Sequence, residues 1–202
     1  MTEPLMTASP FKLEEFWTTE TGEHLETARK TFETLMPAFG EMLESCVLSV
    51  RQGGKILFFG NGGSAADAQH LATELTVRYI GNRAAIPAIA LTTDSSALTA
   101  IGNDLGFEYL FSRQIEALGN AGDIAIGIST SGTSPNVLAA LATAREKGVT
   151  TIGFTGRDGG KMHDLCDILL VVPSHTTSRI QEMHITLGQM LCGALEQRLG
   201  LA

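Results

Sequence analysis

Five short apolar runs alternate with helical segments through most of this chain, and that alternation constrains the fold more than any other feature. The runs are solid rather than alternating, as is typical of parallel strands covered on both faces. Strands that are separated by helices predict an α/β fold with a doubly wound, five-stranded parallel sheet and right-handed crossovers. The expected strands are residues 55–59, 85–90, 123–128, 150–155 and 168–172.

The N-terminal part of the chain has a different pattern. From about residue 11 to residue 50 the apolar residues recur at helical spacing, and Pro37 breaks the run. We therefore expect a helical extension over residues 1–52, followed by a ligand-binding domain over residues 53–202. Because the extension is amphipathic and additional to the sheet, we expect it to form a subunit interface.

Composition excludes several classes of protein. The net charge is −8, and only 14 Lys and Arg residues are scattered along the 202 residues, which argues against a nucleic-acid-binding protein. The chain has neither 18 consecutive apolar residues nor a leader pattern at its N-terminus, so we expect no membrane contact and a soluble, cytoplasmic protein. Cys46, Cys166 and Cys192 are widely spaced, which predicts buried free thiols rather than a metal knuckle or disulfides.

Two of the expected strands run into loops of small residues that lead directly into helices. The first loop contains Asn61, Gly62, Gly63 and Ser64, and the second contains Ser129, Thr130, Ser131, Gly132, Thr133 and Ser134. Both loops fall at the carboxyl ends of strands, where ligands bind in such sheets. Since the positive end of a helix dipole lies there, the loops predict a phosphate site. The alternative is that the serines only cap the second helix.

His70 and Glu74 stand four residues apart, on one face of the helix that follows the first loop. On spacing alone, a solvated His–Glu pair on a helix surface is the more common arrangement. A metal or catalytic site is the alternative.

Four blocks of sequence carry a resemblance to a known family. They are the two loops, the residues Ile-Gly-Asn-Asp at 101–104, and the residues Arg-Ile-Gln-Glu-Met-His at 179–184. Together they resemble the sugar-isomerase (SIS) domain of the phosphoheptose isomerase family, over almost the whole chain. The resemblance implies a homotetramer that converts sedoheptulose 7-phosphate to D-glycero-D-manno-heptose 7-phosphate, the first step towards the heptoses of bacterial surface polysaccharide such as lipopolysaccharide.

The resemblance also implies roles for particular residues. Glu74 matches the catalytic base, and zinc is expected on His70, Glu74, Gln181 and the residue at position 189. The expected substrate-binding residues are Asn61, Gly62, Gly63, Ser64, Glu74, Asn103, Asp104, Ser129, Thr130, Ser131, Ser134 and Gln181.

At position 189 this chain departs from the family, because it has Gln189 where the isomerases usually carry a histidine. A carboxamide can offer its oxygen to a metal, but it cannot exchange protons near neutral pH. Gln189 is therefore expected to be a weak or absent fourth ligand. His184 lies on the same helix about 140° around from Gln189, and is either a packed residue or a substitute proton carrier.

A second function from a different class stays open on the sequence. The factors that bind the DnaA replication initiator have the same fold and similar blocks without isomerase activity. Glu74 favours the enzyme, because a missing base would prevent proton abstraction, whereas Gln189 favours the interaction protein.

Overall fold

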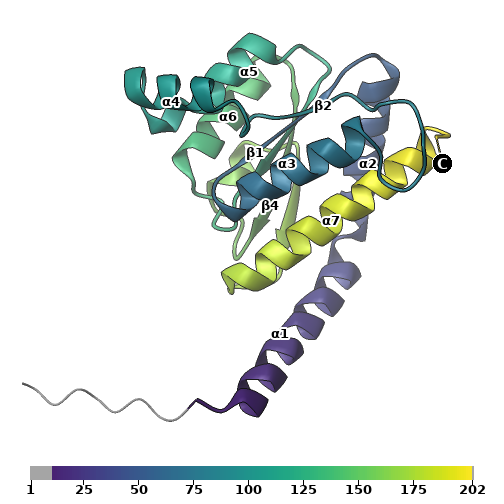
Figure 1. Ribbon diagram of the computed structural model, residues 1–202, viewed down its shortest axis with the longest axis vertical. Helices are drawn as coiled ribbons and strands as arrows, with labels where there is room; N and C mark the ends of the chain where they lie inside the picture. The colour runs from purple at the N-terminus through teal and green to yellow at the C-terminus, as the bar shows by residue number, and fades with distance from the viewer. Residues whose placement is uncertain (1–10, 202) are drawn as a thin grey trace, which may run out of the picture.

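A five-stranded parallel sheet lies at the centre of the computed structural model, which describes residues 11–201 (Figure 1). The sheet order is β2-β1-β3-β4-β5, and every neighbouring pair is parallel. This confirms the predicted doubly wound sheet. The strands are β1 (Ile56–Gly60), β2 (Ala88–Ala90), β3 (Ile124–Ile128), β4 (Thr150–Gly156) and β5 (Ile168–Val172).

Helices cover both faces of the sheet. On one face lie α2 (Met36–Arg51), α3 (Gly63–Thr76) and α7 (Thr177–Arg198). The other face carries α4 (Ser95–Asp104), α5 (Ser112–Leu118), α6 (Pro135–Glu146) and the short 3-10 helix η1 (Phe107–Tyr109). A second 3-10 helix, η2 (Gly160–Asp164), precedes β5.

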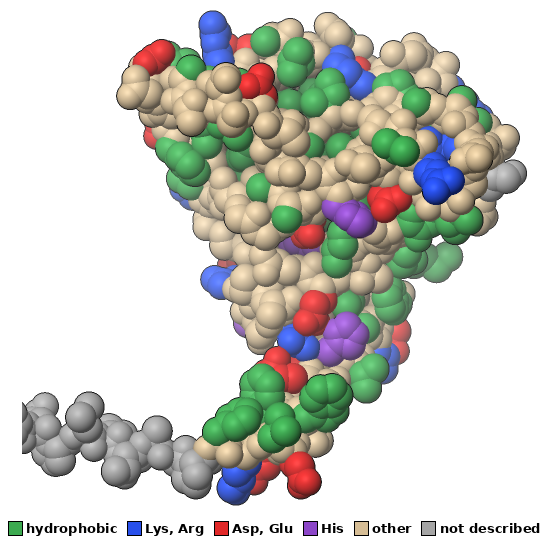
Figure 2. All heavy atoms as spheres, in the orientation of Figure 1, with side chains coloured by type: hydrophobic (Ala, Val, Ile, Leu, Met, Phe, Trp, Pro, Cys, Tyr) green, Lys and Arg blue, Asp and Glu red, His purple; other side chains and the backbone are tan. Residues whose placement is uncertain are grey.

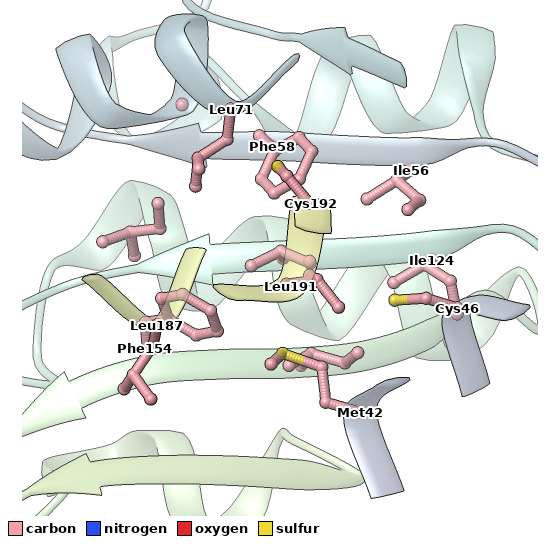
Figure 3. Packing of buried hydrophobic residues seen from close by; sticks show 14 of the residues in the cluster. Met42, Cys46, Ile56, Phe58, Leu71, Ile124, Phe154, Leu187, Leu191 and Cys192 are labelled. Atoms are coloured by element: carbon pink, nitrogen blue, oxygen red, sulfur yellow. The ribbon is translucent and has the colours of Figure 1, made fainter. Parts of the chain in front are cut away.

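Side chains of the central strands β1 and β3 alternate between two hydrophobic cores. In β1, Ile56 and Phe58 face the core beneath α2, α3 and α7, which Figure 3 shows, whereas Leu57 and Phe59 face the core beneath α5 and α6. Because both faces are covered, β1 is buried along its whole length. This explains why the strand reads as an unbroken apolar run.

The predicted strand boundaries differ from the structure by at most three residues. The second strand begins at Ala88 rather than at residue 85, because Pro87 has no amide hydrogen to donate and the Ile86 amide bonds to the carbonyl of Leu75 in α3 instead. The helix that follows the first loop, α3, ends at Thr76. Between α4 and β3 the chain forms η1 and then α5.

The predicted break near Pro37 is confirmed, since α1 (Leu13–Thr34) ends just before it and Pro37 lies in the first turn of α2. The two helices differ in their packing. Helix α2 contributes Met42, Cys46 and Val47 to the core, whereas α1 projects from the body of the molecule (Figure 1). Of the helical extension expected over residues 1–52, the first ten lie outside the described residues.

Helix α1 carries several hydrophobic side chains that the fold leaves exposed. Trp17 is 67% exposed, and the neighbouring Phe16 and Leu25 are also exposed, so hydrophobic side chains gather over this end of the molecule (Figure 2). The subunit interface expected for the N-terminal extension stays a prediction, and α1 offers exposed hydrophobic side chains for it. No helix within residues 11–201 is long and apolar enough to cross a membrane.

Candidate active site

The two Gly/Ser loops lie next to each other at the carboxyl edge of the sheet. Gly60, the last residue of β1, pairs in register with Ile128, the last residue of β3. The side chains of Asn61 and Asn136 bridge the loops through two reciprocal amide hydrogen bonds of 2.9 and 2.8 Å. The predicted phosphate and sugar residues of both loops are thus brought to one place.

In the second loop the hydroxyl groups bond to one another rather than to the helix. The Ser129 and Ser134 oxygens are 2.9 Å apart, as are those of Ser131 and Thr133. Ser134 occupies the N-cap position of α6, but its side chain accepts no capping hydrogen bond. The hydroxyl group of Ser134 is therefore not used to cap the helix, which supports the anion-site interpretation.

Gly132 shapes this loop. Its φ of +65° is in the left-handed region, and a Cβ added there would lie 2.1 Å from the carbonyl oxygen of Gly159. The Lys161 amide donates to the Gly132 carbonyl oxygen at 3.0 Å. The glycine-rich segment around Gly159 and Gly160 therefore packs against the serine loop and supports its conformation.

Helices α3 and α7 bring three of the four predicted zinc ligands together. His70 Nε2 lies 3.3 Å from Glu74 Oε1, and the side-chain amide nitrogen of Gln189 contacts the same His70 nitrogen. The His70 side chain is 49% exposed and that of Glu74 is 21% exposed. The pair is therefore open to a small ligand, yet Glu74 is largely shielded from water.

Gln181 adjoins the first loop. A Cβ added at Gly63 would lie 2.7 Å from the Gln181 side-chain nitrogen, so the end of this side chain lies directly against the start of α3. Eight helical residues, or roughly 12 Å along the axis, separate Gln181 from Gln189.

Asn103 and Asp104 are exposed in the last turn of α4, on the opposite face of the sheet from α3 and α7. Within the described residues, the side-chain hydrogen bond that they make is with each other, at 2.7 Å from Asn103 Nδ2 to Asp104 Oδ1. The fold of one chain thus does not join them to the other site residues through a hydrogen bond. Their role in substrate binding stays a prediction.

His184 is fully buried and its Nε2 donates to the carbonyl oxygen of Thr155 at 3.0 Å. Burial lowers the pKa of His184 to about 4, although the hydrogen bond to Thr155 opposes this shift. The packed-residue alternative is confirmed. A neutral, enclosed imidazole cannot replace the histidine missing at position 189.

The donor groups beside α3 suit a divalent cation in type. Within residues 11–201, no group of three or more His, Cys, Asp or Glu side chains could hold a metal ion. His70 supplies an imidazole nitrogen, Glu74 a carboxylate oxygen, and Gln189 a carboxamide whose oxygen takes the place of its nitrogen when the group turns by 180°. One nitrogen and two oxygen ligands fit zinc in a three-ligand site.

Sequence reasoning missed Asn136, which holds the two loops together, and the buried ion pair between Arg83 and Glu196. Asn136 follows Pro135 at the start of α6, and its place beside the serine loop was the available signal. No spacing signal joins Arg83 to Glu196, because the two residues are more than a hundred positions apart.

Comparisons with known proteins define the class first. The family model of the SIS domain matches residues 21–156, more than half of the chain. A phosphoheptose isomerase of Paramagnetospirillum magneticum is 58% identical over 92% of this chain and 96% of that protein. The chain belongs to the phosphoheptose isomerase family, and it is an isomerase of sugar phosphates.

Solved structures agree. The phosphoheptose isomerase of Neisseria gonorrhoeae superposes with a TM-score of 0.87 at 44% identity, over 92% of this chain and all of that one. A phosphoheptose isomerase of Francisella tularensis gives a TM-score of 0.90 at 35% identity, over 93% of this chain and all of that one. The replication-initiator-binding alternative is not favoured by these matches.

The buried His184 predicts a pH-dependent stability. Its pKa is about 4 in the folded chain and near 6.5 when unfolded, so between these values the unfolded chain binds a proton that the native state does not. The stabilising contribution is fully present above pH 6.5 and is lost, by about 1.4 kcal/mol per pH unit, as the pH falls towards 4. Urea unfolding at a series of fixed pH values should show that the free energy of unfolding depends less steeply on pH in His184→Gln than in the parent. Equal slopes would mean that His184 takes up its proton as easily in the native state.

Proposed function

We propose that this chain interconverts sedoheptulose 7-phosphate and D-glycero-D-manno-heptose 7-phosphate through an enediol. The observation that carries the proposal is the His70–Glu74 pair, which is contacted by Gln189 and stands on the helix that begins at the first Gly/Ser loop. Aldose–ketose isomerisation needs a base beside C1 and C2 and a group that polarises the carbonyl. Both are available at this pair.

The phosphate end of the substrate is assigned to the serine loop. Ser129, Ser131 and Ser134 offer hydroxyl groups at the positive end of α6, and Thr130 and Ser64 adjoin them. Ten helical residues, roughly 15 Å, separate Ser64 from Glu74. Because the Cα–Cβ bond of Glu74 tilts back towards the start of α3, the distance to its carboxylate is shorter and suits an extended sugar phosphate.

The sugar would lie between these two ends, with Asn61, Gly62, Gly63 and Gln181 along it. The Glu74 carboxylate would take a proton from one carbon of the C1–C2 pair and return it to the other. Zinc, when held by His70, Glu74 and Gln181 with Gln189 as a weak fourth ligand, would polarise the carbonyl group. Gln189 keeps the site polar but moves no proton.

The interaction-protein alternative is the weaker proposal. It requires a cleft without a base, whereas Glu74 is present, shielded from water and beside His70. We place the enzyme in the cytoplasm and in heptose synthesis for bacterial surface polysaccharide, because the charged phosphate keeps such substrates from crossing a bilayer unaided.

We also propose that the active form is a homotetramer. The uncovered side chains of α1, above all Phe16, Trp17 and Leu25, form the kind of apolar surface that a partner buries. A neighbouring copy could also bring its Asn103 and Asp104 to a site that lacks them within one chain.

Glu74→Gln should abolish isomerisation, together with deuterium uptake from the solvent at C2 of the substrate, because a carboxamide cannot accept the proton. The matched control is Glu146→Gln, which changes an exposed glutamate at the end of α6 and should leave both rates unchanged. Mass spectrometry of the substrate measures the exchange. Exchange by Glu74→Gln at the parent rate would place the base elsewhere, and absence of exchange in the zinc-supplied parent would refute the proposed function.

The double variant Ser129→Ala, Ser131→Ala should raise the KM for sedoheptulose 7-phosphate about tenfold or more, since two hydrogen bonds to a charged group are lost. The control is Ser95→Ala, Ser96→Ala, at the start of α4, where Asp94 already caps the helix. Steady-state kinetics decides. An unchanged KM in the loop variant would remove these serines from the phosphate site.

Gln189→His should retain more zinc through dialysis and turn over faster, because imidazole is the better zinc ligand and can exchange protons. A positioned general acid typically contributes 10²–10⁴-fold, which sets the upper range of the gain. Gln197→His, two turns further along α7 and exposed, is the control. Metal analysis would contradict the expectation if parent and Gln189→His retained equal amounts of zinc.

Trp17→Glu should dissociate the tetramer, because it puts a charge into the apolar surface of α1. Sedimentation equilibrium measures the mass, with the parent expected at four chains. Glu14→Gln, in the exposed first turn of the same helix, is the control. A parent that sediments as a single chain would refute the tetramer.

A further inference from the structure

A buried ion pair, outside the residues assigned so far, joins the end of α3 to α7. Arg83 lies in the segment between α3 and β2, and its Nε donates to Oε1 of Glu196 at 2.7 Å. The two side chains are only 1% and 3% exposed. Such a pair is costly to desolvate and contributes little net stability compared with apolar residues of the same size, so its presence needs another reason.

The remaining Arg83 nitrogens bind the last turn of α3. Nη2 donates to the backbone carbonyl oxygen of Glu74 and Nη1 to that of Leu75, both at 2.7 Å. Carbonyl groups at the end of a helix have no partner within the helix, and a cation is favourable there. Arg83 therefore holds the backbone of the very residue that carries the proposed catalytic carboxylate.

Glu196 on α7 binds the segment that follows α3. Its Oε1 also accepts a hydrogen bond from the Tyr79 amide at 3.0 Å. Burial raises the pKa of Glu196, but the Tyr79 amide and Arg83 outweigh that effect, so the pKa lies below its usual value. The pair is therefore charged on both sides at neutral pH.

Helices α3 and α7 are also in contact nearer to the candidate active site. A Cβ added at Gly188 would lie 2.5 Å from Leu71, so α7 approaches α3 closely just beside Gln189 and His70. Glu196 follows Gln189 by seven residues, which is two turns on the same face and roughly 10 Å along the axis. The ion pair thus holds the far end of the contact surface that carries the candidate site.

We propose that Arg83 and Glu196 are positioning residues for Glu74, setting the place of its carboxylate and the register of α3 against α7. The inference rests on the proposed isomerase function. An error of about 1 Å in the position of a catalytic group can reduce the rate about a hundredfold, so loss of the pair should lower kcat while substrate binding at the serine loop persists.

The decisive variant is Arg83→Met, Glu196→Leu, which removes both charges together and leaves neither buried alone. We expect kcat to fall about tenfold or more with KM within about twofold of the parent, and the thermal midpoint to stay within about 4 °C. Arg83→Lys keeps the charge without the planar fork and should give an intermediate kcat.

The matched control is Lys55→Met, which breaks the partly buried Lys55–Asp123 ion pair just before β1 and β3, at the edge of the sheet opposite the serine loop. It should lower the thermal midpoint and leave kcat unchanged. The proposal is overturned if the double variant keeps the parent kcat, or if Lys55→Met loses kcat to the same degree.

Two other outcomes are also decisive. If the double variant does not fold, Arg83→Lys is assayed at a temperature where circular dichroism shows it folded; a lowered kcat with unchanged KM supports the proposal, and a parental kcat overturns it. A parent without isomerase activity would overturn the proposed function and this inference together, whereas an active parent with parental kcat in the Arg83 variants would overturn the inference alone.

Discussion

The parallel pairing of β1 with β3 is the constraint on which the candidate site depends. Their last residues, Gly60 and Ile128, lie side by side, so the loops that follow begin at the same edge of the sheet. From there the chain turns to opposite faces, α3 to one and α6 to the other, and the starts of both helices remain adjacent. The two hydrogen bonds between the Asn61 and Asn136 side chains connect the first loop to the start of α6. Two helix dipoles therefore converge on one small region, as anion binding requires.

The second determinant is the close contact between α3 and α7. At Gly63 and Gly188 an added Cβ would meet the side chains of Gln181 and Leu71 respectively, so the two helices lie close together. This proximity brings a residue from the C-terminal helix to His70, more than a hundred positions earlier in the chain. Figure 1 shows the two helices crossing the same face of the sheet, and Figure 3 shows the side chains of Leu71, Leu187 and Leu191 between them and the strands.

Much of this arrangement follows from sequence, and the exceptions have physical causes. The strands, and the helices between them, were predictable from the sequence. A strand buried on both faces, such as β1, must be apolar throughout. The His70–Glu74 pair was predictable because the i, i+4 spacing belongs to a single helix. Contacts between distant elements carry no such periodicity, which is why Asn136 and the Arg83–Glu196 pair were missed. The separation of Asn103 and Asp104 from the rest of the site likewise depends on the face that α4 covers.

The replacement of histidine by Gln189 makes the position of Glu74 more important than it would be in a site with two proton carriers. Gln189 cannot exchange a proton, and His184 is neutral and bonded to the Thr155 carbonyl oxygen. In the proposed mechanism a single carboxylate serves both C1 and C2, so its reach to each carbon depends on the position of its backbone. The hydrogen bond from Arg83 to the Glu74 carbonyl oxygen immobilises that part of the residue. A site with one proton-carrying residue depends more on such a restraint than a site with two.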